Sequence, residues 1–279
     1  MLTCAIRSSY WHVRGHVCSN NLTLHRNKAI NTSTSSKLYE TARFFMSSDT
    51  NENEDSSTLI KDVPLEKKEE DLPITFADIS RAQVAIRDGI LRTSCNKSHY
   101  LSELIGANVY LKTEFRQFTG SFKERGARNA ILQLLKKSKS DSSDTSKFNG
   151  VIAASAGNHA LALAYHGQQL GVPVTVVMPT VAPLAKVDKC KSFGCRIIIE
   201  GAHIGEAKDV AERLAEDESL AYVNGYDDPP ILAGAGTMGI EMVEDVPDMD
   251  AVVVPVGGAG LIAGVSCAIK TLKPEVKVS

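Results

Sequence analysis

A lysine at the start of a predicted helix is the first residue whose position suggests chemistry. Lys123 lies in the segment GSFKERGA, beside the aromatic Phe122. The helix dipole disfavours a positive charge in the first helical turn and tends to lower the pKa of an amine there. An amine with a lowered pKa can act as a Schiff-base nucleophile. From this segment alone, a solvated lysine beside Glu124 is the simpler interpretation.

A turn of small residues follows the predicted strand 150–154 and opens the next predicted helix. Its sequence is Ser-Ala-Gly-Asn-His, from Ser155 to His159. Small residues at a strand end leave backbone N–H groups free for a carboxylate, and the side chains of Ser155 and Asn158 can add hydrogen bonds. This pattern favours an amino acid substrate. Taken singly, Ser155 or Asn158 could be only a helix cap, and His159 only a buried helical histidine.

A glycine loop joins the predicted strand 251–254 to a helix in the segment AVVVPVGGAGLIAG. Glycines allow consecutive backbone N–H groups to point inward, and the helix N-terminus adds partial positive charge, which suits a phosphate. The spacing is neither GxGxxG nor a P-loop, and a tight packing turn is the alternative. A lysine, a carboxylate turn and a phosphate loop in one body are together what a pyridoxal phosphate enzyme needs.

The elements that position these segments alternate between short β-branched runs and helix-length amphipathic stretches, which predicts an α/β fold with a parallel sheet. The predicted strands are 108–112, 150–154, 174–178, 196–200 and 251–254, and the predicted helices are 122–137, 157–170, 182–193, 204–216, 231–244 and 261–272. Residues 138–149 are predicted to form a polar surface loop.

Composition excludes several classes of protein. The 279 residues include 31 Lys and Arg against 33 Asp and Glu, a net charge of −2, and 43% are hydrophobic. No polybasic excess favours nucleic-acid binding, and no apolar run reaches the roughly 18 residues that a membrane-spanning helix needs. The six cysteines form no CxxC or metal-ligand pattern, so we expect free thiols in a reducing compartment and no metal site.

The N-terminal part differs in charge from the rest. Residues 1–48 hold six basic residues and one acid and are rich in Ser and Thr, whereas the remaining chain is acidic. We predict a mitochondrial transit segment at 1–48, with a disordered cytosolic tail as the alternative. Residues 49–73 are predicted to be a disordered acidic linker, and residues 74–279 to form the catalytic domain.

The domain 74–279 resembles the fold type II pyridoxal phosphate enzymes, which are tryptophan synthase β-like. Within them it is similar to the threonine/serine dehydratases and their close relative serine racemase. The likeness rests on LKTEFRQFTGSFKERGARNA, SAGNHALALA, VVMPTVAPLAKVDKCKSFGC, NGYDDPPILAGAGTMGIE and VPVGGAGLIAG, in the family's order. It implies two open parallel-sheet subdomains and pyridoxal 5'-phosphate as the cofactor.

The resemblance also implies roles for single residues. Lys123 would carry the cofactor imine, with Phe122 beside the cofactor and Asn158 bonding its ring hydroxyl. The phosphate would lie in the loop formed by Gly257, Gly258, Ala259 and Gly260 with the Leu261 amide. The substrate carboxylate would bind at Ser155, Ala156, Gly157, Asn158 and His159.

The implied reaction is a β-elimination that converts L-threonine or L-serine to a 2-oxo acid and ammonia, with Lys123 taking the Cα proton. Ala156 stands where the racemases resembling this family have a second serine, so racemisation is disfavoured. The resemblance implies a small amino acid as the substrate and a homo-oligomeric enzyme.

The chain ends at Ser279, where a new strand begins, and lacks the family's remaining sequence. We therefore expect a truncated C-terminal part. The alternative is a catalytically silent truncated isoform or fragment that binds the cofactor or pairs with the full-length protein.

Overall fold

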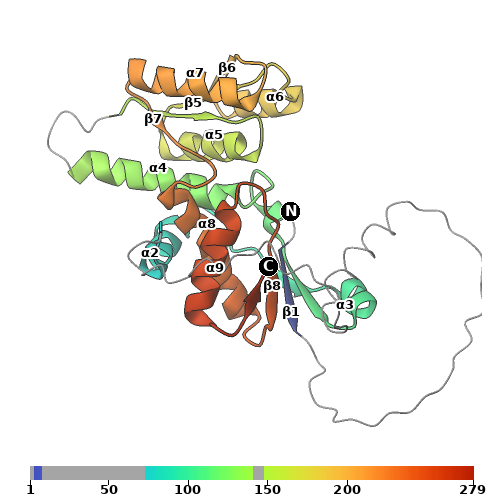
Figure 1. Cartoon of the computed structure of the whole chain (residues 1–279). Helices are drawn as coiled ribbons and strands as arrows, with labels where there is room; N and C mark the ends of the chain where they lie inside the picture. The colour runs from blue at the N-terminus through green and yellow to red at the C-terminus, as the bar shows by residue number, and fades with distance from the viewer. Residues whose placement is uncertain (1–2, 8–72, 141–147) are drawn as a thin grey trace, which may run out of the picture.

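The computed structural model describes residues 3–7, 73–140 and 148–279, and it has the predicted α/β architecture (Figure 1). Its strands are β1 (Thr3–Arg7), β2 (Cys95–Lys97), β3 (Asn108–Lys112), β4 (Val151–Ala154), β5 (Val174–Met178), β6 (Arg196–Ile199), β7 (Ala221–Tyr222), β8 (Ala251–Val253) and β9 (Lys277–Val278). Its helices are α2 (Phe76–Ile86), α3 (His99–Ile105), the 3-10 turn η2 (Glu114–Arg116), α4 (Lys123–Ser140), α5 (Asn158–Leu170), α6 (Leu184–Ser192), α7 (Ile204–Asp217), α8 (Pro229–Asp245) and α9 (Gly260–Leu272).

One sheet is fully parallel, in the order β6-β5-β4-β7. Successive residues of β4 face opposite sides of the sheet because side chains alternate along a strand. Val151 and Ala153 belong to the core cluster that includes residues of α5, whereas Ile152 and Ala154 pack with residues of α7. A parallel sheet buried on both faces explains why its strands are continuous apolar runs.

The second sheet has the order β2-β3-β1-β8-β9 and is mixed. Only β8 and β9 run parallel, whereas β1 is antiparallel to both β3 and β8, and β2 is antiparallel to β3. The expectation of two parallel sheets therefore holds for one sheet and is corrected for the other. The short α3 connection returns the chain beside β2 in the opposite direction, and β1 enters between two later strands.

Strand β1 falls inside the predicted transit segment 1–48. Residues 8–48 of that segment, the predicted linker up to residue 72, and residues 141–147 of the predicted surface loop lie outside the described residues. The described start of that loop is helical, since α4 continues to Ser140.

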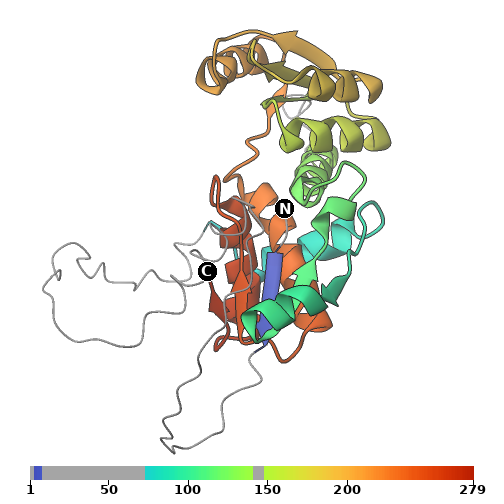
Figure 2. The same cartoon turned by 90° about the vertical axis from the view of Figure 1, so that its right-hand side faces the viewer.

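Helix α4 lies between the two halves of the molecule (Figures 1 and 2). Above it in Figure 1 are the parallel sheet with α5, α6 and α7, and below it are α2, α8, α9 and the mixed sheet. Helix α8 packs against α4 and α9 through glycines. A Cβ on Gly234 would lie 2.5 Å from the Arg125 carbonyl oxygen, and one on Gly264 would lie 2.3 Å from the Leu232 carbonyl oxygen. These close contacts fix α4, and thus the residue at its first turn.

Within the described part of the chain, no helix is both long enough and apolar enough to span a membrane. Cys190 and Cys195 are buried thiols, as expected for cysteines that do not form disulfides. Burial raises the pKa of Cys190 to about 11 and that of Cys195 to about 12. Both side chains therefore act as small apolar groups of the core.

Candidate active site

Lys123 is the first residue of α4, and its amine is held rather than solvated. The Nζ atom donates a hydrogen bond to the Gly225 carbonyl oxygen and lies 5.3 Å from the ring centroids of both Phe122 and Tyr226. Burial lowers the pKa of Lys123. The neighbouring Glu124 carboxylate does not pair with it, because it accepts the Thr119 hydroxyl at 2.8 Å instead. The simpler interpretation, a solvated lysine beside Glu124, is wrong.

A buried ion-pair network anchors the turn that carries Lys123. Arg125 is fully buried, and its guanidinium donates two hydrogen bonds to Glu114, at 2.8 and 2.9 Å, and two to Glu241, at 2.7 and 2.8 Å. Lys112, also fully buried, reaches Glu241 at 2.6 Å and the Thr93 carbonyl oxygen at 2.6 Å. The network joins β3, η2, α4 and α8, so it fixes the N-terminal end of α4 from three directions.

Each charge in this network is stabilised by its partners. Burial alone would raise the pKa of Glu114, but the Arg125 guanidinium holds it below its usual range. Burial alone would lower the pKa of Arg125, but the two carboxylates raise it. Buried charges persist only when they are paired and hydrogen-bonded, as these are. Sequence reasoning missed all four residues, because Glu241, which joins Arg125 and Lys112, lies 116 residues from Arg125 in the chain.

The small-residue turn at the start of α5 has the expected free amides. The Ser155 hydroxyl accepts hydrogen bonds from the amides of Gly157 (3.2 Å) and Ala160 (3.3 Å), so it caps the helix. The backbone N–H groups of Ala156, Asn158 and His159 donate to no other described residue. These amides point to an anion site at the positive end of α5. The role of the turn in carboxylate binding stays a prediction.

His159 is a buried histidine, and its role in substrate binding stays a prediction. Its Nε2 atom lies 3.1 Å from the Val223 carbonyl oxygen, and its Nδ1 atom is buried without a partner among the described residues. Burial lowers the pKa of His159 to about 4. A Cβ on Gly225 would lie 2.4 Å from the imidazole Cγ, so the backbone at Gly225 lies directly against the ring. The carbonyl oxygen of the same Gly225 accepts the hydrogen bond from Lys123 Nζ.

The glycine loop between β8 and α9 is packed against Tyr226. A Cβ on Gly258 would lie 2.1 Å from the tyrosine ring, and one on Gly260 would lie 1.9 Å from the Tyr226 carbonyl oxygen, so both positions require glycine. A Cβ on Gly257 would meet nothing within 4 Å. Ala259 adopts the left-handed conformation, with φ of 59°. This departure from glycine is accommodated at some cost in backbone energy.

The loop presents the amides that a phosphate needs. The Gly260 N–H donates to the Gly258 carbonyl oxygen at 2.8 Å, which closes the loop. The N–H groups of Gly257, Gly258, Ala259 and Leu261 donate to no other described residue. Free amides beside the N-terminus of α9 form a cradle for a dianion. The residues present therefore fit the phosphate of pyridoxal 5'-phosphate, although their individual roles stay predictions.

The three predicted segments meet at one loop, residues 223–228, between β7 and α8. Gly225 contacts both Lys123 and the ring of His159, and Tyr226 contacts both the lysine and the glycine loop. Asp228 fixes this loop by accepting the Asn224 amide at 2.7 Å. The sequence NGYDD was recognised only as part of the resemblance. Its Asn and Asp residues, which favour turns, were the signal for a structured loop.

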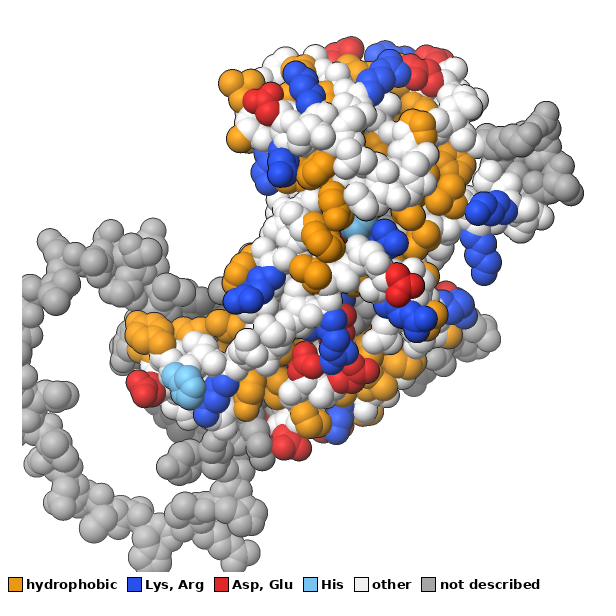
Figure 3. Space-filling view, turned by 180° about the vertical axis from the view of Figure 1, so that it is seen from behind, with side chains coloured by type: hydrophobic (Ala, Val, Ile, Leu, Met, Phe, Trp, Pro, Cys, Tyr) orange, Lys and Arg blue, Asp and Glu red, His pale blue; other side chains and the backbone are white. Residues whose placement is uncertain are grey.

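Apolar side chains lie exposed around this site. Tyr226 is 52% exposed and Val256, beside the glycine loop, is 60% exposed. Seen from behind, the molecule carries hydrophobic side chains between its two halves, with basic side chains among them (Figure 3). An aromatic cofactor ring bound near Lys123 would cover apolar surface of this kind.

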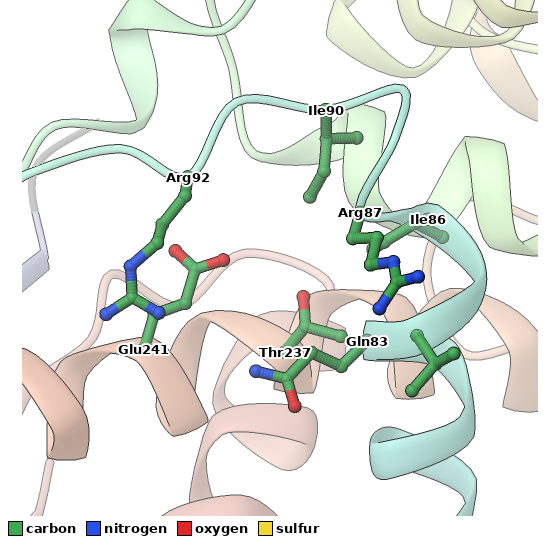
Figure 4. A pocket seen from close by; sticks show the side chains of 8 residues that line it. Gln83, Ile86, Arg87, Ile90, Arg92, Thr237 and Glu241 are labelled. Atoms are coloured by element: carbon green, nitrogen blue, oxygen red, sulfur yellow. The ribbon is translucent and has the colours of Figure 1, made fainter.

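A cavity of about 280 Å³ lies elsewhere, between α2, the segment after it and α8 (Figure 4). Its charged lining residues are already paired: Arg87 with Asp88, Arg92 with Glu244 and Asp245, and Glu241 with Arg125. Paired charges leave little for a ligand to neutralise, so we place the chemistry at Lys123. No cluster of His, Cys, Asp or Glu that could hold a metal occurs among the residues that the structure describes.

The comparisons with known proteins agree with this geometry. The chain matches the model of the pyridoxal-phosphate dependent enzyme family over residues 86–279. It is 47% identical over 205 residues to an L-threonine ammonia-lyase of Thermotoga maritima, a match that covers 74% of this chain and 49% of that protein. It is 43% identical over 206 residues to the catabolic L-threonine dehydratase TdcB of Staphylococcus aureus, covering 74% and 57%. The chain thus spans about half the length of the curated relatives it matches.

Solved structures give the same result. The processed form of threonine deaminase isoform 2 from Solanum lycopersicum superposes with a TM-score of 0.68 at 34% identity, covering 81% of this chain and 63% of that one. Maize serine racemase superposes with a TM-score of 0.68 at 31% identity, covering 74% and 60%. With Lys123 and the glycine loop in place, the chain belongs to the fold type II pyridoxal-phosphate-dependent enzymes, in the threonine/serine dehydratase family.

Proposed function

We propose that the chain supplies the active site of a threonine or serine dehydratase, which converts L-threonine or L-serine to a 2-oxo acid and ammonia. The observation that carries the proposal is the half-buried Lys123, which meets the glycine loop and the start of α5 at the loop 223–228. Relatives named as threonine ammonia-lyase and threonine dehydratase support the substrate class.

Two helix N-termini of this chain would each bind one anionic group, the cofactor phosphate at one and the substrate carboxylate at the other. The free amides of Gly257, Gly258, Ala259 and Leu261 would hold the cofactor phosphate, and those at the start of α5 the substrate carboxylate. Lys123 would bond the cofactor covalently through Nζ, with Phe122 beside it. When bound, pyridoxal 5'-phosphate supplies an electron sink for the charge that develops at the substrate Cα atom.

Lys123 is suited to move the Cα proton. Burial lowers the pKa of its amine, which increases the fraction of the amine that is free to accept a proton at Nζ. The hydrogen bond to the Gly225 carbonyl oxygen holds Nζ in place between the Phe122 and Tyr226 rings. We assign the proton transfer to Lys123 rather than to His159, because burial lowers the pKa of His159 to about 4 and makes it a weak base.

The experiment is an assay of the 279-residue chain with L-threonine and L-serine in the presence of pyridoxal 5'-phosphate. A dehydratase releases ammonia together with 2-oxobutanoate from threonine, or with pyruvate from serine. Release of D-serine without ammonia would instead favour a racemase, against which Ala156 argues. A chain that binds the cofactor but releases no product would favour the catalytically silent alternative.

We also propose that the protein is a homo-oligomer, on the resemblance alone. Light scattering after size-exclusion chromatography measures its mass in solution. A monomer at the concentrations used in the assay would contradict this proposal.

We further propose import into mitochondria. The proposal is supported by the six basic residues and the single acid of residues 1–48. Strand β1 lies in the same segment and pairs with β3 and β8, so removing the segment would remove a strand from the middle of a sheet. A fluorescent fusion of residues 1–50 that enters mitochondria supports import, and one that stays diffuse in the cytosol overturns it. N-terminal sequencing of the imported protein then tells whether β1 is retained.

A further inference from the structure

A lysine on a neighbouring helix makes a contact that the proposed chemistry has not yet used. Lys186 lies in the first turn of α6, and its Nζ atom donates a hydrogen bond to Asn158 Oδ1 at 2.9 Å. Asn158 is the first residue of α5 and belongs to the small-residue turn. The contact spans 28 residues of sequence and joins α6 to the start of α5.

The position of Lys186 is unfavourable for a plain surface lysine. A positive charge in the first turn of a helix opposes the helix dipole. Lys186 has no carboxylate within 4.0 Å among the described residues, so no ion pair compensates for this. Its acceptor is a neutral amide, which leaves the positive charge available to a nearby anion.

The contact fixes the orientation of the Asn158 amide. A lysine ammonium carries three donors and no acceptor, so only the oxygen of the Asn158 side chain can face it. The amide nitrogen, with its two donors, must then point away from Lys186. A hydrogen bond to a charged donor also polarises the amide and strengthens its N–H groups as donors.

We propose that Lys186 is a positioning residue that holds the Asn158 amide with its N–H groups toward the bound pyridoxal 5'-phosphate. The proposal rests on the proposed function and on the role that the family resemblance implies for Asn158, a hydrogen bond to the hydroxyl of the cofactor ring. Lys186 itself touches neither cofactor nor substrate. It acts through the hydrogen bond to Asn158.

The test is a double-mutant cycle read as the dissociation constant of pyridoxal 5'-phosphate, measured from the absorbance of the bound cofactor. Lys186→Met should weaken binding about tenfold, the effect of losing one charge-assisted hydrogen bond. Asn158→Ala should weaken it by a similar or larger factor. If Lys186 acts through Asn158, adding Lys186→Met to Asn158→Ala should cause no further loss.

Lys191→Met is the matched control, because Lys191 is exposed on the same helix and its side chain makes no hydrogen bond or ion pair with the described residues. It removes the same charge and should leave binding unchanged. A second readout needs no cofactor: in ¹⁵N NMR spectra, the Asn158 side-chain amide signal should shift in Lys186→Met and not in Lys191→Met.

Two failures are distinguishable. If the unsubstituted chain does not bind pyridoxal 5'-phosphate, the proposed function fails for this chain and the proposal on Lys186 fails with it. If the unsubstituted chain binds, but Lys186→Met binds equally well or its effect adds fully to that of Asn158→Ala, only the proposal on Lys186 is overturned.

Discussion

Replacing Gly260 by alanine tests whether the glycine loop packs against the loop 223–228, which holds the Lys123 amine. The new Cβ would lie 1.9 Å from the Tyr226 carbonyl oxygen and 3.2 Å from a Leu232 methyl group. The first contact involves backbone, so the loop 223–228 or the glycine loop must move by about 1.5 Å or more to restore an ordinary contact. Overpacking of this kind costs about 1–3 kcal/mol, and the better helix propensity of alanine returns about 0.5–1 kcal/mol.

We therefore expect Gly260→Ala to lower the free energy of unfolding by about 1–2 kcal/mol, measured by urea denaturation at pH 7. Because Tyr226 follows the residue whose carbonyl accepts Lys123, we also expect cofactor binding to weaken by more than tenfold. Gly257→Ala is the folding control, since its Cβ meets nothing within 4 Å, and its stability should stay within about 0.5 kcal/mol of the parent chain. A Gly260→Ala chain as stable as the control, with unchanged cofactor binding, would refute the packing described here.

Three further predictions concern stability. Burial lowers the pKa of His159 to about 4, so the unfolded chain binds more protons than the folded chain between that pH and about 6.5. The free energy of unfolding should therefore fall by about 2 kcal/mol from pH 7 to pH 5. In urea titrations at these two pH values, His159→Gln should remove most of this loss. Arg125→Met leaves the buried carboxylates of Glu114 and Glu241 without their main partner and should cost about 3–5 kcal/mol; a loss below about 1 kcal/mol in urea denaturation would count against the network. Ala259→Gly relieves a left-handed alanine and should raise stability by about 0.5–1 kcal/mol, whereas a lower urea midpoint would contradict the observed φ of 59°.

The elements of the parallel sheet could be predicted closely because their sequence pattern is local. The run that forms β5 was predicted with the observed bounds, since a strand buried on both faces is a continuous apolar segment. Strand β3 of the mixed sheet was also predicted with its observed bounds. Helix α8 begins two residues before the predicted start because Pro229 and Pro230 occupy its first turn, where their missing N–H groups cost nothing.

Several elements were missed, and α2 and β1 show two different reasons. Helix α2 carries a readable signal, because Thr75 and Asp78 form a capping box before the apolar positions of the helix. Strand β1 carries none, because five residues near the N-terminus give no local sign that they pair between β3 and β8. Strand order in a mixed sheet depends on contacts that no short window of sequence contains.

The candidate site shows the same division. Lys123, the small-residue turn and the glycine loop were predictable only in combination, because the Lys123 segment and the turn residues taken alone favoured simpler interpretations. The network around Arg125 was not, since Arg125 and Glu241 lie 116 residues apart. The contact between Lys186 and Asn158 was missed for the same reason, because only the packing of α6 beside α5 brings these residues together.

The most direct test of the central claim is to locate the bond between the cofactor and the chain. The protein is incubated with pyridoxal 5'-phosphate, reduced with borohydride to make the lysine bond permanent, digested and examined by mass spectrometry. The account predicts the modification on Lys123, and it predicts that Lys123→Ala shows neither the modified peptide nor the absorbance band of the bound cofactor. Modification of another lysine to the same extent, or an unchanged band in Lys123→Ala, would contradict the assignment of Lys123.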